Sequence, residues 1–228
     1  MLNKKDVYIV IAAYNEGKSI KKVVASVKNA GYNNIIVIDD CSRDNTYEVI
    51  SKLPIFALKH IMNRGQGASL KTGIDFALSK NAKYIVTFDA DGQHRPEDLD
   101  AMVKPVVNNV CDITLGSRFL NKKTKMPFTR YITLKVGVIM QWIFYGILLT
   151  DAHNGFRCLS RHAAKKINII SDRMEHASEI VEEIKKNKLR YKEIPVIIHY
   201  TEETLAKGHG GFSQAIKVLW KMLIKKLL

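Results

Sequence analysis

Cysteine is scarce in this sequence, with three among 228 residues. Cys41, Cys111 and Cys158 are odd in number and form no C-x-x-C pair, which argues against a disulfide framework and against a zinc site. Unpaired thiols are typical of a reducing compartment. We therefore expect a cytoplasmic protein, and a chain of this length can bury a core of its own.

A long apolar run is also absent. The longest, VGVIMQWIFYGILL at 136–149, contains Gln141 and falls short of the roughly 20 residues that a membrane-spanning helix needs. The apolar run near the N-terminus is short and breaks at Asn15 and Glu16, with no clear cleavage site, which is unlike a signal peptide. We expect neither a secretion signal nor a transmembrane span.

Acidic residues are few relative to basic ones. The chain has 22 Asp and Glu against 36 Lys and Arg, a net charge of +14. Such an excess favours a polyanionic partner, either nucleic acid or an anionic membrane surface. The aromatic content of 8%, the dispersed basic clusters and the lack of a recognised motif argue against nucleic acid. We therefore expect no nucleic acid as a partner, while the charge by itself does not select a membrane surface.

Apolar, β-rich runs alternate with helical patterns through the first half of the chain. Strands are expected at 7–14, 34–40, 55–61, 83–91 and 112–119, with helices at 16–31, 44–53, 65–80 and 95–109. The strand runs are continuous rather than alternating, as in strands buried on both faces. This order predicts βαβ units and an α/β fold, a doubly wound, mostly parallel sheet with flanking helices.

The pattern changes after residue 120. A basic loop leads to a helix over 131–149 that is apolar over most of its girth, a candidate for lying at a membrane interface; the alternative is a buried core helix. Further helix is expected over 161–188 and a strand over 193–200. We predict a main domain of residues 1–210 and an amphipathic, basic C-terminal helix over 211–228.

Two carboxylates follow directly after the fourth predicted strand, in FDADGQH. Asp89 and Asp91 point the same way in an extended segment, so they can converge on Mg²⁺ or Mn²⁺, and Gln93 could add a neutral oxygen. Ligands of doubly wound sheets bind at this edge, where the strands end. The alternative is a solvated acidic turn with its corner at Asp91 and Gly92.

The end of the second predicted strand is also acidic. Asp39 and Asp40, in VIDDCSRD, could accept hydrogen bonds from a nucleobase or a ribose hydroxyl. The alternative is that the segment only caps the next helix, through Ser42, Asp44 and Asn45.

Two more strand ends carry residue types that suit phosphate. In NRGQGAS, Gly65 and Gly67 permit close approach of a backbone, and Arg64 could meet a phosphate; a plain entry into the next helix is the alternative. Arg118, in GSRF, faces the same edge and could neutralise a phosphate.

The order of these segments is more specific than any one of them. IAAYNE, VIDDCSRD, NRGQGAS, FDADGQHRPEDL, GSRF and TDAHNGFR occur in the sequence and at the spacing of family 2 glycosyltransferases with the GT-A fold. The match covers about residues 6–200. More narrowly, the chain resembles polyprenyl-phosphate glycosyltransferases, the dolichyl-phosphate mannosyltransferase-like group.

The resemblance implies an inverting, metal-dependent hexosyltransferase. It would move a sugar from a UDP- or GDP-linked donor to a polyprenyl or dolichyl phosphate, with Mg²⁺ or Mn²⁺ as cofactor. A lipid acceptor would place the protein peripherally at the cytosolic face of a membrane, held there by 131–149 and 211–228. A separate membrane protein is a possible partner. The alternative is a soluble metal-dependent transferase that acts on a sugar hydroxyl in polysaccharide or glycan synthesis.

The resemblance also implies roles for individual residues. The nucleotide-sugar would be bound by Ala13, Tyr14, Glu16, Asp39, Asp40, Arg64, Gly67, Asp89 and Ala90. The metal would be held by Asp89, Asp91 and Gln93, and the acceptor phosphate by Arg118 and Arg130. Catalysis would rest on Asp91, Asp151 and Arg118, with Asp151 near the donor sugar as either a base or a positioning group.

The chain departs from the family pattern in three places. Ala12 replaces the usual proline of PAYNE, and Cys41 replaces the usual glycine of DDGS, where it makes the turn less permissive. The late RxxGxSK of the mannosyltransferases is missing, and YTEETLAKGHGGFS stands in its place. The sugar and the nucleoside of the donor therefore stay open.

Overall fold

The structure is a computed structural model of the whole chain. It describes residues 2–121, 124, 126–151 and 153–200. The predicted C-terminal helix over 211–228 and the three lysines of the basic loop, Lys122, Lys123 and Lys125, lie outside the described residues.

Seven strands form one sheet in the order β3-β2-β1-β4-β6-β5-β7. β6 runs antiparallel to its neighbours β4 and β5, and the other pairs are parallel. The strands are β1 (Val7–Ala13), β2 (Asn34–Asp39), β3 (Phe56–Lys59), β4 (Tyr84–Asp89), β5 (Ile113–Ser117), β6 (Arg157–Ser160) and β7 (Tyr191–Pro195). The predicted α/β fold with a mostly parallel sheet is confirmed.

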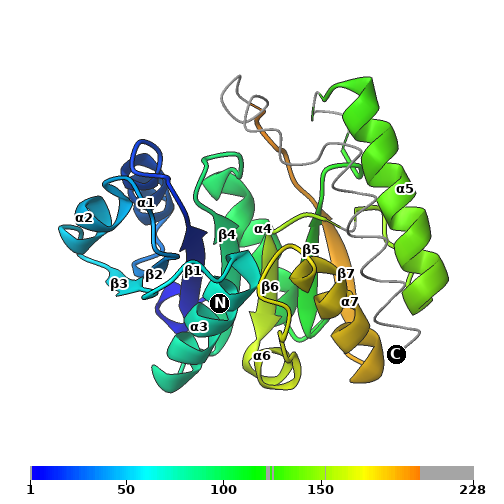
Figure 1. Cartoon of the computed structure of the whole chain (residues 1–228). Helices are drawn as coiled ribbons and strands as arrows, with labels where there is room; N and C mark the ends of the chain where they lie inside the picture. Colours follow the sequence, from blue (N-terminus) through cyan, green and yellow to red (C-terminus); the bar gives the residue numbers. More distant parts are fainter. Residues whose placement is uncertain (1, 122–123, 125, 152, 201–228) are drawn as a thin grey trace.

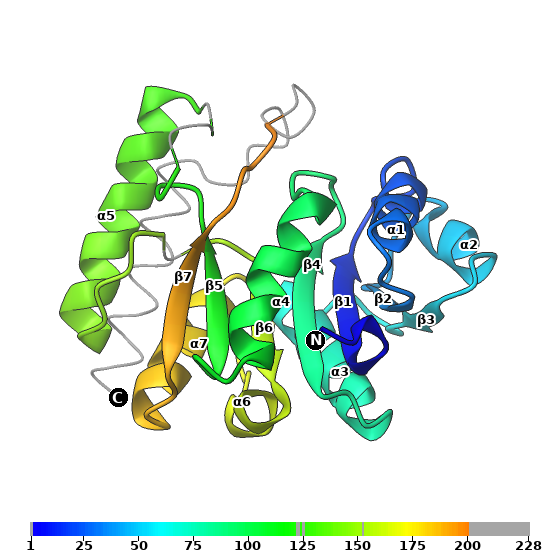
Figure 2. The ribbon, with the colours of Figure 1, turned by 180° about the vertical axis from the view of Figure 1, so that it is seen from behind.

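Helices cover both faces of this sheet (Figures 1 and 2). Residues of α1, α2 and α4 share one buried apolar cluster, and those of α3, α6 and α7 share another on the opposite face. The helices are α1 (Ile20–Asn29), α2 (Thr46–Ser51), α3 (Gln66–Ser79), α4 (Leu99–Val107), α5 (Phe128–Tyr145), α6 (Arg161–Lys166) and α7 (His176–Lys186), with short 3₁₀ turns at Lys4–Asp6 and Pro96–Asp98.

The continuous apolar runs of the sequence are explained by this two-sided cover. In β1, Ile9 and Ile11 belong to the cluster under α1 and α4, whereas Val10 belongs to the cluster under α3. Successive side chains point to opposite faces of a strand, so a strand covered on both sides needs apolar residues at every position. Each such buried side chain stabilises the fold by roughly 1.5–3 kcal/mol.

The second half differs from the sequence prediction in its boundaries. The apolar helix α5 begins at Phe128 rather than 131 and ends at Tyr145, because Gly146 adopts a left-handed conformation with φ of 66° that stops the helix. The helix expected over 161–188 is two helices, α6 and α7, and the strand expected over 193–200 is β7, Tyr191–Pro195.

One strand was missed altogether. The sequence predicts only an interruption in DAHNGFRCLS, yet Arg157–Ser160 form β6 at the centre of the sheet. The strand is short and starts with a charged residue, so its pattern gives no strand signal. Because β6 is antiparallel to β4 and β5, its first residue lies at the edge where the parallel strands end, and residues 150–156 therefore enter the candidate site.

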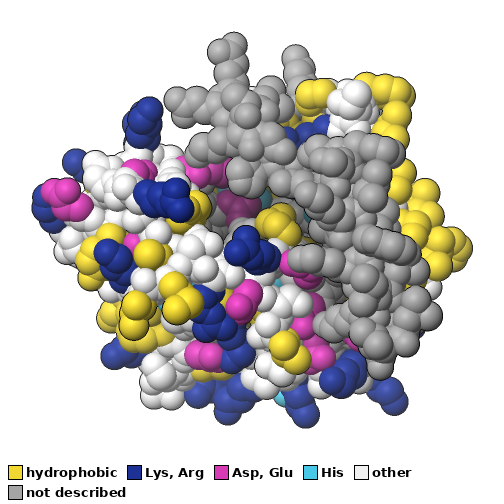
Figure 3. All heavy atoms as spheres, viewed as in Figure 1, with side chains coloured by type: hydrophobic (Ala, Val, Ile, Leu, Met, Phe, Trp, Pro, Cys, Tyr) yellow, Lys and Arg dark blue, Asp and Glu magenta, His cyan; other side chains and the backbone are white. Residues whose placement is uncertain are grey.

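The apolar helix α5 stands beside β7 and is not a core helix (Figure 1). Its buried residues are Val138 and Gln141, and hydrophobic side chains form the edge of the molecule where α5 lies (Figure 3). Its exposed large apolar residues are Phe128, Tyr131, Ile132, Val136, Ile139, Trp142 and Ile143. The buried-helix alternative is therefore wrong. Across the described part of the chain, no helix has the length and apolar character to cross a bilayer.

Candidate active site

The register of the parallel strands brings three predicted site segments to one edge. Ala13 at the end of β1 pairs with Asp39 of β2, and Ala12 pairs with Asp89 of β4. Asp39 is completely buried and its carboxylate accepts a hydrogen bond from the backbone of Ser42 at 3.3 Å. Ala13 is buried as well, whereas Tyr14 beyond the strand end is 41% exposed.

The first two loops hold each other in place. The backbone N–H of Asn15 donates to Ser42 Oγ at 2.9 Å, and the Asn15 side chain accepts from the backbone of Arg43 at 2.8 Å. Glu16 donates its backbone N–H to Thr46 Oγ1 at 2.8 Å. This contact joins the start of α2 to the AAYNE loop, so the two predicted nucleoside-binding segments form one unit.

Helix capping, the alternative for VIDDCSRD, occurs through one of its three candidates. Asp44 accepts hydrogen bonds from the backbone of Thr46 at 2.9 Å and of Gly17 at 3.0 Å. Asn45 makes no side-chain cap, and Ser42 bonds to Asn15 instead. Capping and ligand binding are thus compatible at this segment, because Asp39 takes no part in the cap.

Cys41 occupies a position that suits glycine. Its φ is 59°, in the left-handed region that residues with a β-carbon adopt at a cost of about 1 kcal/mol. The family pattern has glycine here, so the departure noted in the sequence falls on a backbone position that strains cysteine.

Asp40 holds the loop after β3 in place through its side chain. Its buried carboxylate lies 2.8 Å from His60 Nδ1 and accepts hydrogen bonds from the backbone of Arg64 at 3.0 Å and of Gly65 at 2.6 Å. These contacts fix the start of α3 relative to β2. The nucleotide-binding role of Asp40 stays a prediction, and its observed contacts are structural.

The NRGQGAS segment contacts the loop between α6 and α7, a contact that was not predicted from the sequence. Arg64 forms an exposed ion pair with Asp172 at 2.9 Å. A β-carbon at Gly67 would come within 2.0 Å of the backbone oxygen of Ser171, so only glycine permits this approach. Gly65 has φ of 112°. The loop between α6 and α7 therefore packs against the start of α3, beside the predicted nucleotide-sugar site.

Asp89 lies at the end of β4 and its side chain is 30% exposed. Its Oδ2 lies 2.8 Å from His94 Nε2, and its Oδ1 accepts a hydrogen bond from Gln66 at 3.3 Å. Burial alone would raise the pKa of Asp89, but His94 and Arg157 outweigh it and hold that pKa below its ordinary value. Asp89 is therefore ionised near neutral pH.

Asp91 carries the second carboxylate of the motif. Burial, followed by the charge of Asp89, raises the pKa of Asp91 to about 6. Its Oδ1 accepts a hydrogen bond from the backbone of Gln93 at 3.0 Å, which orients it beside Asp89. Ala90, between the two, is buried. Both carboxylates are partly buried, so the pair is less exposed to solvent than the solvated-turn alternative assumes.

This pair fits a divalent cation of the Mg²⁺ or Mn²⁺ type. Two neighbouring carboxylates, whose negative charges repel each other, are stabilised by a shared cation. Within the described residues no third His, Cys, Asp or Glu joins them in a metal cluster. An open site of two carboxylates suits these ions, which keep several positions for water and diphosphate oxygens. Gln93 stays the predicted neutral ligand.

His94 lies beside the candidate metal motif and was not singled out from the sequence. Its ring is buried and lies 5.3 Å from the ring of Phe88 and 5.0 Å from that of Phe156. Nε2 lies 2.8 Å from Asp89 Oδ2, so the buried imidazole limits the positions open to one predicted metal ligand. Its place in DADGQH was the available signal.

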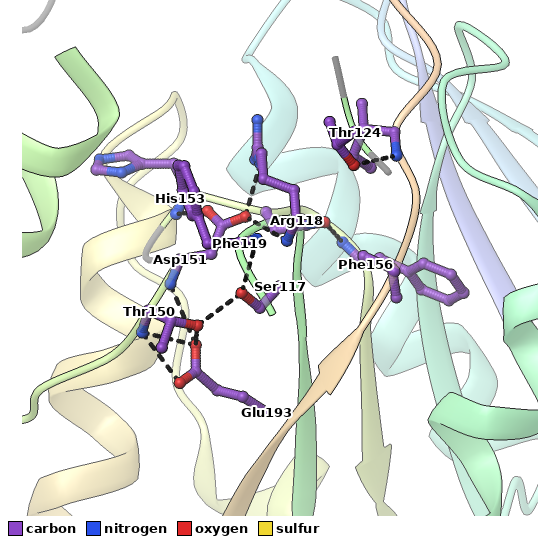
Figure 4. A network of polar contacts seen from close by, with 12 residues as sticks. Ser117, Arg118, Phe119, Thr124, Thr150, Asp151, His153, Phe156 and Glu193 are labelled. Carbon is purple, nitrogen blue, oxygen red and sulfur yellow. Dashed lines mark hydrogen bonds and ion pairs between the residues drawn. The ribbon is translucent and has the colours of Figure 1, made fainter. Parts of the chain in front are cut away.

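A second polar cluster lies at the ends of β5 and β7 (Figure 4). Glu193 accepts hydrogen bonds from the backbone of Thr150 at 2.9 Å and of Asp151 at 3.1 Å, and from Thr150 Oγ1 at 2.8 Å. Ser117 Oγ lies 2.6 Å from Thr150 Oγ1. These contacts hold the backbone before β6, and with it the carboxylate of Asp151.

Asp151 and Arg118 form a buried ion pair. Arg118 donates from Nε to Asp151 Oδ2 at 2.6 Å and from its backbone at 3.0 Å, and the two side chains are 1% and 7% exposed. Burial works to lower the pKa of Arg118, but Asp151 and then Tyr200 outweigh it and raise that pKa. The guanidinium therefore stays charged.

The two arginines predicted to hold an acceptor phosphate meet at Tyr200. Arg118 Nη1 donates to the Tyr200 hydroxyl at 2.8 Å, and the guanidinium carbon of Arg130, on α5, lies 4.5 Å from the centre of the same ring. Tyr200 was not singled out from the sequence, and its position gave no signal of this contact.

Arg157 lies between the two acidic clusters. It is the first residue of β6, is buried, and its Nη1 has no hydrogen-bond partner among the described residues. Burial lowers the pKa of Arg157 to about 10, while the charges of Asp89 and Asp151 act in the opposite direction. A buried cation therefore separates the predicted metal carboxylates from Asp151.

Comparison with known proteins identifies the family. The model of "Glycosyl transferase family 2" matches residues 8–168, which is more than half of the chain. The chain belongs to glycosyltransferase family 2. The resemblance drawn from the sequence motifs is thus confirmed. The acidic edge of the sheet, together with the basic cluster of Arg118 and Arg130, is the candidate active site of this glycosyltransferase.

Two relatives of this glycosyltransferase extend over nearly its whole length. An uncharacterized protein of Methanocaldococcus jannaschii is 38% identical over 99% of this chain and 94% of its own. The UDP-N-acetylglucosamine–dolichyl-phosphate N-acetylglucosaminyltransferase of Methanococcus voltae is 34% identical over 98% of this chain and 97% of its own.

Among solved structures, the fold is shared with glucosyl-3-phosphoglycerate synthase from Mycobacterium tuberculosis. Its complex with Mn²⁺, UDP-glucose and phosphoglyceric acid aligns with a TM-score of 0.71 and 14% identity, over 95% of this chain and 79% of that one. At this identity the likeness shows the fold alone, which is GT-A.

Proposed function

We propose that this glycosyltransferase moves a sugar from a nucleotide diphosphate sugar to a polyprenyl or dolichyl phosphate. The observation that carries this proposal is the convergence of Arg118 and Arg130 on Tyr200, beside Asp151. A sugar hydroxyl needs no such concentration of positive charge, whereas a phosphate is recognised by guanidinium groups. The Methanococcus voltae relative, which uses a dolichyl phosphate by name, supports the same acceptor.

For the donor, we propose a UDP-sugar held at the ends of β1, β2 and β4. The name of the Methanococcus voltae relative includes UDP-N-acetylglucosamine, and the structural neighbour was solved with UDP-glucose and Mn²⁺. Asp89 and Asp91, with Gln93, would hold Mg²⁺ or Mn²⁺. The ion would offset the negative charge that builds on the departing diphosphate.

The contacts of Asp151 favour a positioning role over that of a base. Its carboxylate is committed to Arg118 at 2.6 Å and is almost fully buried. A phosphate acceptor needs no strong base, because its second pKa is about 6 and it is largely ionised at neutral pH. In the proposed reaction the acceptor oxygen attacks the anomeric carbon in line and inverts it, while Asp151 keeps Arg118 oriented.

The lipid acceptor would be met at the cytosolic face of a membrane. The apolar side chains of α5 are exposed, and Arg130 and Lys135 lie on the same helix. Such a helix suits an interface of acyl chains and anionic headgroups. We therefore propose peripheral attachment through α5, with 1–210 as the catalytic domain and 211–228 as a second attachment. A separate membrane partner stays a sequence prediction.

The test is an acceptor competition with the purified chain and Mn²⁺. Labelled UDP-N-acetylglucosamine, UDP-glucose and GDP-mannose would each be offered with dolichyl phosphate and with a panel of free sugars and glycans. The proposal predicts label in a lipid-extractable, acid-labile product from at least one donor. Label in the sugar acceptors, with none in the lipid fraction, would instead establish the soluble hydroxyl-directed alternative.

A further inference from the structure

The segment 196–200 connects the two halves of the site. It leaves the end of β7 and rises over the carboxyl edge of the sheet (Figure 1). The backbone of Val196 donates to Ser117 O at 3.0 Å, and that of His199 donates to Gln93 O at 3.0 Å. Ile198 forms a β-bridge with His94. One short stretch is thus fixed both to the end of β5 and to the loop that carries the metal motif.

Tyr200 ends this stretch and touches both predicted acceptor arginines. Its hydroxyl accepts a hydrogen bond from Arg118 Nη1 at 2.8 Å, and its ring faces the guanidinium of Arg130 at 4.5 Å. The ring face attracts one cation while the hydroxyl fixes the direction of the other. Tyr200 thereby holds the two positively charged guanidinium groups near one another, and its contact with Arg130 involves no carboxylate.

Arg118 is oriented from two sides. Asp151 accepts a hydrogen bond from Nε at 2.6 Å, and Tyr200 accepts one from Nη1 at 2.8 Å. Neither of these two contacts uses Nη2, which can therefore bind a ligand. A long side chain with several rotatable bonds gains a single geometry only when such partners lock it. Removing either partner would free the guanidinium to turn.

We propose that Tyr200 is a positioning residue that holds Arg118 and Arg130 as one clamp for the acceptor phosphate. This inference rests on the proposed function. Because His199 is tied to Gln93, the clamp also keeps a fixed distance from the metal motif. In-line transfer requires the acceptor oxygen and the donor carbon at a set separation, and a displacement of about 1 Å costs on the order of a hundredfold in rate.

The test compares Tyr200→Phe and Tyr200→Ala in the full chain, with UDP-N-acetylglucosamine, Mn²⁺ and dolichyl phosphate. Tyr200→Phe removes the hydrogen bond to Arg118 but keeps the ring under Arg130, and should raise the KM for dolichyl phosphate about tenfold. Tyr200→Ala removes both contacts and should raise it further. The KM for the donor should not change in either variant. Tyr191→Phe and Tyr191→Ala, at an exposed tyrosine on β7, are the matched controls.

A binding measurement separates failure of this inference from failure of the proposed function. Titration of geranyl phosphate by calorimetry should show weaker binding to both Tyr200 variants, and geraniol should not bind. If the wild type transfers the sugar, and both variants keep the acceptor KM and the binding of geranyl phosphate, the role of Tyr200 alone is overturned. No transfer by the wild type, with binding that the variants weaken, overturns the proposed reaction but keeps the clamp. No binding of geranyl phosphate by the wild type overturns both.

Discussion

The two halves of the site are built in different ways. On the proposed donor side, β1, β2 and β4 end in register, and side chains such as Asp40 and Asn15 bond mainly to the backbone of the neighbouring loop. On the proposed acceptor side, side chains far apart in sequence pair with each other: Arg118 bonds to Asp151, 33 positions away, and to Tyr200, 82 positions away. The donor side therefore follows from strand order, whereas the acceptor side depends on individual long-range pairs.

The largest effect is expected on the donor side, from loss of a metal carboxylate. Asp89→Ala or Asp91→Ala should lower the transfer rate about a thousandfold or more, because a bound cation supplies several kcal/mol of stabilisation to the departing diphosphate. Mn²⁺ binding, followed by the paramagnetic signal of the free ion, should weaken in parallel. Glu97→Ala, at an exposed carboxylate of the 3₁₀ turn that follows the motif, is the control. Full activity of both aspartate variants in excess chelator would contradict the metal role.

On the acceptor side, the next largest effect should come from Asp151→Asn. The change leaves the buried guanidinium of Arg118 without its counter-charge, which should lower the free energy of unfolding by about 3 kcal/mol. Asp112→Asn weakens an ion pair of 2.9 Å with Arg190, whose side chain is 52% exposed, and should cost about 1 kcal/mol. Urea denaturation of both variants measures the difference. Equal losses would show that burial does not distinguish the two pairs.

Part of this contrast could be read from the sequence. The continuous apolar runs gave β1, β2 and β4, and their register then brought Asp39 and Asp89 to one edge. β6 could not be predicted from the sequence, because Arg157 at its start is buried only through the packing of the strands on either side. The contacts of Tyr200 could not be predicted either, since no local sequence pattern indicates which distant arginine a tyrosine will contact.

Packing of the donor side against the loop between α6 and α7 is tested by Gly67→Ala. The new methyl group would meet the backbone oxygen of Ser171 at 2.0 Å, so the loop must move, at a cost of about 2 kcal/mol. Gly92→Ala is the comparison, because its nearest neighbour would be Val23 at 3.8 Å and only its φ of 76° is unfavourable, at about 1 kcal/mol. Thermal unfolding of both variants gives the ranking. A smaller loss for Gly67→Ala than for Gly92→Ala would contradict the close approach.

The smallest effect should be a gain. Cys41→Gly restores the residue that suits a φ of 59° and should stabilise the protein by about 0.5 kcal/mol, since the strain relieved exceeds the entropy that glycine costs. Cys41→Ala keeps the β-carbon and should give no gain. Chemical denaturation of the two variants side by side distinguishes relief of backbone strain from loss of the thiol.

Arg118 and Arg130, in the proposed reaction, recognise a phosphate on the acceptor. The most direct measurement offers dolichyl phosphate and dolichol, which share the lipid and differ in the phosphate, to the wild-type chain with Mn²⁺ and the preferred donor. Transfer to dolichyl phosphate with none to dolichol is the predicted result. Equal transfer to both lipids, or transfer to dolichol alone, would contradict the account.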